Sequence, residues 1–223
     1  MDLTTSVALV TGANRGLGRV LAAQLLERGA KVYAGARNPS AADLPGALPL
    51  QLDVTDPASV ERAAKAAPDV TLLINNAGSS TGQSLVHGDL DRIRLEMETH
   101  YFGTLGVTRA FAPLIEANGG GAILNVLSVL SWLHPGGTGA YSAAKAAAWA
   151  LTNAVRDELA PRGIAVSALH VAYMDTDMAA HVPAEQKTDP AIVAALALDG
   201  IATGAREILA DDVTRQVKAG LAA

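Results

Sequence analysis

Val-Ala-Leu-Val-Thr-Gly-Ala-Asn-Arg-Gly-Leu-Gly, residues 7–18, decides the fold of this chain. Its first four residues are an apolar run of the buried-strand type, the glycines follow at once, and a helical pattern of Val20, Leu21, Leu25 and Leu26 comes next. Glycine lets a backbone turn tightly, while the free N–H groups of a helix N-terminus attract phosphate. The stretch predicts a strand, a phosphate-binding turn and a helix, although its glycine spacing differs from the G-x-G-x-x-G dinucleotide fingerprint.

The same alternation of strands and helices continues along the chain. We expect strands near residues 6–11, 31–36, 48–53, 70–75, 121–128, 164–170 and 207–210. Helical patterns fill the gaps at about 16–29, 57–67, 89–117, 139–161 and 190–204. Strands that are apolar throughout are typical of a parallel sheet covered on both faces, which binds ligands at the carboxyl ends of its strands. The pattern predicts one Rossmann-like α/β domain over residues 1–223, with a doubly wound parallel sheet of about seven strands.

Composition narrows the class of protein. The 223 residues are 50% hydrophobic and 17% charged, which suits one domain with a buried sheet. The absence of cysteine excludes disulfides, thiolate zinc sites and a cysteine nucleophile, and we expect no metal site. A net charge of −5 without a basic run argues against nucleic acid as a partner. The N-terminus lacks signal-peptide features and no apolar stretch approaches about 18 residues, so we expect a cytoplasmic protein with no membrane association.

Tyr141-Ser-Ala-Ala-Lys145 carries the chemistry, together with Ser128 thirteen residues before the tyrosine. Residues four apart on a helix share a face, which places Lys145 beside Tyr141. An ammonium about 5 Å from a phenolate favours the ionised phenol by roughly 3 kcal/mol, or about 2 pKa units, and brings the tyrosine towards a usable general acid and base. By itself such a pair is more typical of an ordinary helix surface.

The chain contains three further motifs besides this Tyr-x-x-x-Lys pair. Thr-Gly-x-x-x-Gly-x-Gly at 11–18 follows the first strand, Asn-Asn-Ala-Gly at 75–78 follows the fourth, and Ser128 follows the fifth. With this combination the chain resembles a short-chain dehydrogenase/reductase over residues 5–178. All four motifs fall at the carboxyl ends of expected strands, where a doubly wound sheet binds its ligands.

The resemblance implies a role for each catalytic position. Tyr141 would donate a proton to a substrate carbonyl, and Ser128 would bind and orient the same oxygen. Lys145 would lower the pKa of Tyr141 and hold the nicotinamide ribose. Ser131 is a rival to Ser128, but the thirteen-residue spacing to the tyrosine favours Ser128.

The resemblance also divides the chain into a cofactor half, about 1–120, and a catalytic and substrate half, about 121–223. The cofactor-binding positions that it implies are Gly12, Asn14, Arg15, Gly16, Leu17, Gly18, Arg37, Asp53, Val54, Asn75, Ala77, Gly78, Tyr141, Lys145 and Thr176.

Two arginines favour NADP(H) over NAD(H). In Rossmann-type sites an acid at the end of the second strand binds the ribose 2′-hydroxyl of NAD and would repel the extra phosphate of NADP. The second strand of this chain is followed by Arg37 instead, and Arg15 lies inside the glycine loop. Both side chains would bind a 2′-phosphate. The alternative is that they are ordinary solvent-exposed arginines.

Two positions depart from the family pattern. His100 replaces the asparagine that usually completes a catalytic tetrad by holding a water next to the lysine. A histidine ring nitrogen can also hold a water, so His100 is a candidate member of the proton relay, with a purely structural histidine as the alternative. The second departure is Val171-Ala172, where relatives commonly have Pro-Gly.

Bulky side chains after the fifth and sixth strands are expected to surround the substrate. They are Trp132, Leu133, His134, Tyr173 and Met178, in addition to the catalytic Ser128 and Tyr141. These mostly apolar groups favour a small uncharged ketone or secondary alcohol, unless they are simply covered loop residues. We expect a homodimer or homotetramer whose subunits meet through the helices at 89–117 and 139–161.

The sequence therefore predicts an NADPH-dependent carbonyl reductase that also works in reverse as a secondary-alcohol dehydrogenase. The alternative from another class is a dinucleotide-binding sensor or scaffold that has kept the fold without turnover. A sugar-nucleotide epimerase or dehydratase, which shares the Tyr-x-x-x-Lys pair, is disfavoured by the glycine spacing at 11–18.

Overall fold

The computed structural model of the chain describes residues 1–221 and contains one seven-stranded parallel sheet. Its strands are β1 (Val7–Thr11), β2 (Lys31–Ala36), β3 (Leu48–Gln51), β4 (Leu72–Asn75), β5 (Gly121–Val126), β6 (Ile164–His170) and β7 (Glu207–Leu209). Their order is β3-β2-β1-β4-β5-β6-β7, and every neighbouring pair is parallel. The predicted doubly wound α/β fold is confirmed, while residues 222 and 223 of the expected domain lie outside the described residues.

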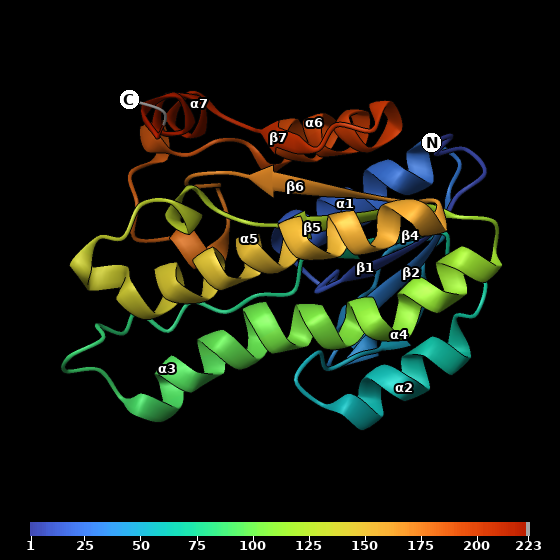
Figure 1. The fold of residues 1–223 in the computed structure, drawn as a ribbon, viewed down its shortest axis with the longest axis horizontal. Helices are drawn as coiled ribbons and strands as arrows, with labels where there is room; N and C mark the ends of the chain where they lie inside the picture. The colour runs from blue at the N-terminus through green and yellow to red at the C-terminus, as the bar shows by residue number, and fades with distance from the viewer. Residues whose placement is uncertain (222–223) are drawn as a thin grey trace.

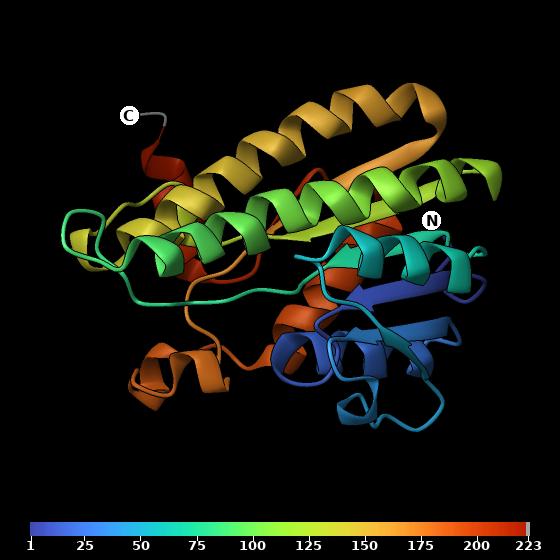
Figure 2. The ribbon, with the colours of Figure 1, turned by 90° about the horizontal axis from the view of Figure 1, so that it is seen from below.

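Helices cover both faces of this sheet (Figure 1). They are α1 (Gly16–Glu27), α2 (Pro57–Ala66), α3 (Leu90–Met97), α4 (Thr104–Ala117), α5 (Gly139–Leu159), α6 (Pro190–Thr203) and α7 (Asp212–Gly220). Figure 2 shows α4 and α5 side by side as one layer, with α3 continuing the line of α4. Short 3-10 turns lie at Pro39–Ala41, Val129–Ser131, Gly136–Thr138, Ala160–Arg162, Asp177–Ala179 and Ala184–Gln186.

The interior strands are largely apolar because each of their faces packs against helices. Successive side chains of a strand point to opposite faces. On one face, strand residues such as Val10 and Leu124 join the core formed with α1 and α6. On the other face, Leu9 and Ile123 join the core formed with α2, α4 and α5. Both cores hold the sheet rigid, so the residues at its carboxyl edge are fixed in place.

The strand order reverses at β1, which lies between β2 and β4. In an open α/β sheet this reversal leaves a crevice outside the carboxyl ends of the strands, and ligands bind there. The glycine turn after β1 and the Asn-Asn-Ala-Gly segment after β4 both open onto this point. The fold thus brings two of the predicted motifs to one place.

Two elements differ from the expected pattern. The helix expected at 89–117 contains a π-helical segment, η2 (Glu98–Gly103), between α3 and α4. The backbone is packed tightly there, since a Cβ atom on Gly103 would lie 3.0 Å from both the Glu98 carbonyl oxygen and Val54. Helix α7 was not expected at all; the Asp211 carboxylate caps it by accepting a hydrogen bond from the Thr214 N–H at 2.7 Å.

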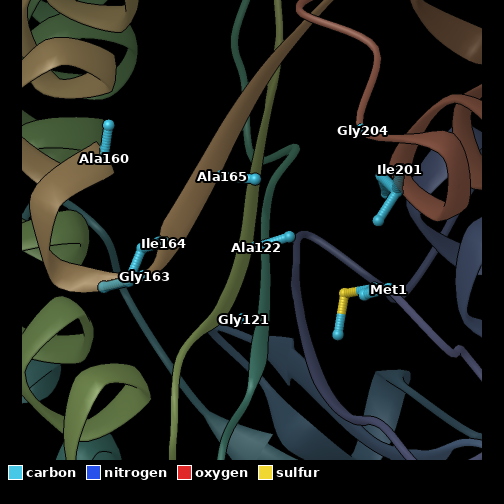
Figure 3. A pocket seen from close by; sticks show the side chains of 9 residues that line it. All are labelled: Met1, Gly121, Ala122, Ala160, Gly163, Ile164, Ala165, Ile201 and Gly204. Atoms are coloured by element: carbon cyan, nitrogen blue, oxygen red, sulfur yellow. The ribbon is translucent and has the colours of Figure 1, made fainter.

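A hollow of about 390 Å³ lies at the amino ends of β5 and β6, beside the end of α6 (Figure 3). Its lining is Met1, Gly121, Ala122, Ala160, Gly163, Ile164, Ala165, Ile201 and Gly204. It lies at the edge of the sheet opposite the motifs and offers no titratable side chain. Within residues 1–221, no helix combines the length and the apolar character that crossing a bilayer requires.

Candidate active site

The glycine turn after β1 has the shape that a phosphate requires. Gly12 and Gly16 adopt positive φ angles of 67° and 51°, a region that other residues enter only with strain. A Cβ atom on Gly18 would lie 2.3 Å from the Gly12 carbonyl oxygen, so only glycine fits there. Arg15, the N-cap residue of α1, makes no side-chain capping bond. The first N–H groups of α1 are therefore free to bind an anion.

Thr11 and Asn76 hold this turn in place. The Thr11 hydroxyl accepts hydrogen bonds from the N–H groups of Asn76 and Ala77, both at 2.9 Å. The Asn76 amide donates to the carbonyl oxygens of Thr11 at 2.9 Å and Gly12 at 3.3 Å. The sequence motifs include Thr11 and Asn76 but gave neither a role; the adjacency of β1 and β4 is the feature that links them.

Asn75 has a different environment from the one expected. Its side-chain amide donates to Asn125 Oδ1 at 2.8 Å and to Thr108 Oγ1 at 3.3 Å, and the residue is buried. Asn125 in turn donates to Thr152 at 2.9 Å. The Asn75 side chain thus ties β4 to β5 and α4 in the interior, and does not point into the crevice.

Other residues predicted to bind the cofactor lie around the same crevice. Thr176 is close to the glycine turn, because a Cβ atom on Gly16 would lie 3.4 Å from Thr176 Cγ2. The Arg15 side chain is 67% exposed and lies 3.3 Å from the Asp177 carboxylate. Arg37 is exposed directly after β2 and takes part in none of the ion pairs found within residues 1–221.

Asp53 and Val54 follow β3 near the same edge. The Asp53 carboxylate accepts hydrogen bonds from the Thr55 N–H at 3.0 Å and the Thr55 hydroxyl at 2.7 Å. Both residues are partly buried. The turn after β3 is therefore fixed by its own side chains, with Asp53 at its start.

Ser128, Tyr141 and Lys145 come together at the ends of β5 and α5. The Lys145 ammonium lies 5.6 Å from the centre of the Tyr141 ring and donates to the Val126 carbonyl oxygen at 2.8 Å. Ser128 is buried, and its hydroxyl accepts from the Leu130 N–H at 3.1 Å. Ser131 Oγ accepts from the Ser128 N–H at 3.4 Å, so the rival serine caps the turn that positions Ser128.

The electrostatics of Tyr141 and Lys145 follow mainly from burial. Burial raises the pKa of Tyr141, the Glu96 carboxylate raises it further, and the neighbouring Ser128 hydroxyl lowers it. This is the opposite of the lowering expected from Lys145, whose ammonium is held by Val126 instead. Burial also lowers the pKa of Lys145 to about 8, against an opposing effect of Glu96. Burial thus favours the protonated form of Tyr141, the form that can donate a proton to a carbonyl oxygen.

His100 lies on η2 against the catalytic tyrosine. Its ring and that of Tyr141 meet edge to face, with centroids 5.2 Å apart. His100 Nε2 lies 2.8 Å from the Ser79 carbonyl oxygen and 3.3 Å from the Glu96 carboxylate. A Cβ atom on Gly78 would lie 2.8 Å from His100 Cε1, so the glycine leaves room for the imidazole. The sequence offered no sign of Glu96 beyond its position four residues before His100.

Trp132 does not lie where the sequence predicted. The indole is only 7% exposed, stacks on His170 with centroids 3.9 Å apart and meets Trp149 edge to face. The 3-10 turn Val129–Ser131 directs it into the interior, where its large apolar surface is buried. Trp132 is thus a packing residue of this region, which corrects its assignment to the substrate wall.

His170 connects that packing to Ser128, the predicted catalytic serine. Its Nδ1 lies 3.2 Å from the Ser128 carbonyl oxygen, and burial lowers its pKa to about 4, so the ring is neutral. Lys218 of α7 lies over the rings of both Trp132 and Trp149, at 4.9 and 5.5 Å. The C-terminal helix therefore supports the turn that carries Ser128.

The other expected substrate residues are at the surface. His134 lines a hollow of about 550 Å³ together with Ser84, Leu85, Val86, His87, Gly136, Gly139 and Ala143. Tyr173 is 45% exposed and meets His181 edge to face. Leu133 and Met178 are exposed as well. Within residues 1–221 no cluster of histidine and carboxylate side chains has the composition of a metal site.

Known proteins share this fold and these motifs. The family described as short chain dehydrogenase matches residues 6–187. The 3-oxoacyl-[acyl-carrier-protein] reductase of Vibrio cholerae is 34% identical over 198 residues, which cover 84% of this chain and 81% of that protein. A solved short chain dehydrogenase from Burkholderia cenocepacia, in complex with NADP, is 41% identical with a TM-score of 0.96, over 100% of this chain and 95% of the other.

The chain therefore belongs to the short-chain dehydrogenases, oxidoreductases that act on CH–OH and C=O groups with NAD(P). A 3-ketoacyl-(acyl-carrier-protein) reductase from Brucella melitensis, solved with NADH, is 26% identical with a TM-score of 0.85, over 94% of this chain and 98% of the other. Relatives of one fold thus include complexes with either dinucleotide.

Proposed function

We propose that this protein is an NADPH-dependent reductase of ketones that also runs in reverse as a secondary-alcohol dehydrogenase. The observation that carries the proposal is the juxtaposition of Tyr141, Lys145 and Ser128 at the carboxyl edge of the sheet, beside a glycine turn with free N–H groups. A sensor without turnover would have no need of a buried lysine next to a buried tyrosine, because burying an ammonium is costly.

The crevice fits a dinucleotide. Gly18 keeps the turn tight, because a side chain there would collide with the Gly12 carbonyl oxygen, and the free N–H groups of α1 suit a pyrophosphate. Arg37 and Arg15 would bind the 2′-phosphate of NADP, and the Burkholderia cenocepacia structure at 41% identity holds NADP. Thr176, Ala77 and Gly78 would line the nicotinamide end, where the bound cofactor supplies a hydride to the substrate carbon.

The chain itself supplies the proton. Tyr141 donates its hydroxyl hydrogen to the carbonyl oxygen, and its raised pKa keeps the phenol protonated until the oxygen becomes basic. Ser128 donates a second hydrogen bond to the same oxygen and fixes its direction. The Lys145 ammonium stabilises the phenolate that remains, and it would also bind the nicotinamide ribose. His100 would return the proton to the site.

The substrate is a small uncharged ketone in this proposal. His134 and Tyr173, which are both exposed, would form the walls of the substrate pocket. Neither side chain carries a permanent positive charge that would bind an acidic substrate. A 3-oxoacyl thioester is the second candidate, because the Vibrio cholerae relative is a 3-oxoacyl-[acyl-carrier-protein] reductase. The cytoplasmic location and the homodimer or homotetramer predicted from the sequence are part of this proposal.

NADPH oxidation tests the function directly. We expect purified protein to oxidise NADPH in the presence of aryl or aliphatic ketones or of acetoacetyl-CoA, and Tyr141→Phe to lose at least about 100-fold in kcat. Tyr101→Phe, a change to a partly buried tyrosine on η2, is the matched control and should keep activity. Absence of turnover with every ketone would establish the sensor alternative, and an active Tyr141→Phe would refute the assigned mechanism.

A further inference from the structure

Glu96 is a carboxylate with no exposure to solvent beside the catalytic tyrosine. It accepts hydrogen bonds from the Thr81 N–H and from the Ser79 hydroxyl, the latter at 3.0 Å. These contacts attach the segment after β4 to the end of α3. A buried carboxylate needs such partners, since an isolated charge in the interior is strongly unfavourable. The contacts leave one of its oxygens 3.3 Å from His100 Nε2.

The surroundings of His100 Nε2 assign its proton. Two acceptors flank this nitrogen, the Ser79 carbonyl oxygen at 2.8 Å and the Glu96 carboxylate at 3.3 Å. The Ser79 N–H also lies 3.3 Å away, a contact that only an unprotonated Nε2 would accept. The closer carbonyl and the charged carboxylate together favour a proton on Nε2, and Nδ1 then carries the free lone pair.

We propose that Glu96 is a positioning residue: its buried pair with His100 holds the imidazole edge to face with Tyr141 and keeps the proton on Nε2, so that Nδ1 accepts a hydrogen bond from a water that returns a proton to Tyr141 after each reduction. This inference rests on the proposed function. The proton balance is simple. Tyr141 loses its hydroxyl hydrogen to the carbonyl oxygen, the water held by His100 Nδ1 gives a proton to the phenolate, and that water is restored by one proton from solvent. One proton enters from solvent for each carbonyl reduced.

The charges around His100 suit this task. Ionisable groups face it from two packed elements: Glu96 from α3, and Lys145 with Tyr141 from α5. Burial lowers the pKa of His100, the Lys145 charge lowers it too, and the contacts to Glu96 and Ser79 oppose both effects. The imidazole is thus neutral, the form whose Nδ1 can accept a hydrogen bond, and the Glu96 carboxylate favours the proton on Nε2.

The tautomer of His100 can be measured without cofactor or substrate. We expect nitrogen-15 NMR of the histidine rings, assigned with His100→Asn, to show the Nε2–H tautomer at neutral pH. In Glu96→Gln, where the charge is removed and the size kept, the Nε2–H preference should weaken. An Nδ1–H tautomer in the wild-type protein would overturn the proposal, whatever the outcome for the ketone substrate, and whether or not Glu96→Gln folds.

Kinetics provide the second test. Glu96→Gln should lower kcat for ketone reduction by at least about tenfold with KM nearly unchanged, because proton return and not substrate binding is impaired. Glu98→Gln removes an exposed charge two residues away and should change neither value. In a His100→Asn background the Glu96→Gln change should cost less than about twofold, because its partner is absent. Equal losses in both backgrounds would show that Glu96 is only a structural anchor.

Discussion

The Lys145 ammonium donates a hydrogen bond at 2.8 Å to the carbonyl oxygen of Val126, the last residue of β5. This bond holds the end of Lys145, which is only 5% exposed. The ammonium lies between the end of β5 and the ring of Tyr141. Burial is the stronger influence and lowers the pKa of Lys145 to about 8. The lysine therefore titrates within the range in which enzymes are assayed.

We expect ketone reduction to lose rate as the pH rises through about 8. The Lys145 charge, which stabilises the developing Tyr141 phenolate, is present below that pKa and is lost above it. Steady-state kcat at saturating NADPH, measured between pH 6 and 10, checks this. A flat profile up to pH 10 would contradict the assignment of Lys145.

Lys145→Met should make the protein more stable at pH 7 while abolishing turnover. The folded-state pKa of about 8 lies below the ordinary value of 10.5, so the unfolded chain binds more protons between these values and wild-type stability rises with pH across that window. At pH 7 the buried charge lowers the free energy of unfolding by on the order of 3 kcal/mol, and removing it should recover this amount. The variant also loses the hydrogen bond to Val126, which contributes about 1 kcal/mol. Urea unfolding should show a gain of about 2 kcal/mol at pH 7 that shrinks by pH 10; no gain at pH 7 would contradict the expectation.

The sequence allowed most of the fold to be predicted, because a strand buried on both faces and a helix with one apolar face have distinct periodicities. Ser128, Tyr141 and Lys145 could be predicted to lie together, because residues four apart share one face of a helix and Ser128 follows the preceding strand. Glu96 could not be found in this way, since its role depends on contacts with Ser79 and Thr81 from a loop without periodicity.

The position of Trp132 was unpredictable for a related reason. Its distance from Ser128 in the chain suggested the pocket, whereas its direction is set by a 3-10 turn and by His170 on another strand. Helix α7 begins at a capping box formed by Asp211 and Thr214, and it has too few turns for its pattern to stand out.

Gly18→Ala should prevent NADPH binding and destabilise the fold. The added methyl group would lie 2.3 Å from the Gly12 carbonyl oxygen and 2.4 Å from the Asn76 amide, and neither group has room to move within the glycine turn. Gly106→Ala on α4 is the control, because nothing lies within 4 Å of its new methyl group and alanine favours a helix by about 1 kcal/mol. Tryptophan-fluorescence titration with NADPH and thermal unfolding measure both effects. Unimpaired binding by Gly18→Ala would place the dinucleotide elsewhere.

Arg37→Asp should weaken NADPH binding by at least about tenfold and leave NADH binding almost unchanged. A carboxylate at the end of β2 repels a 2′-phosphate and can accept a hydrogen bond from a 2′-hydroxyl. Arg206→Asp, at the opposite edge of the sheet with a side chain 72% exposed, makes the same charge change away from the crevice. Calorimetric titration with each dinucleotide decides the matter: equal affinities in wild type and Arg37→Asp would mean that Arg37 points away from the cofactor.

Lys218→Met should loosen the C-terminal helix from the turn that carries Ser128. The ammonium of Lys218 lies over Trp132 and Trp149 and pairs with Glu207 at 2.8 Å, while methionine keeps only the apolar stem. We expect a loss of about 1–2 kcal/mol in unfolding free energy. The chain has only these two tryptophans, so its fluorescence reports this cluster directly.

The control for Lys218→Met is Lys65→Met, which removes an exposed lysine from α2. It should leave the emission spectrum and the unfolding midpoint unchanged. The Lys218 variant should instead shift the emission and lower kcat more than it changes KM, because Ser128 loses support through His170 while the substrate walls remain. A variant with wild-type fluorescence and stability would show that α7 does not hold the catalytic turn.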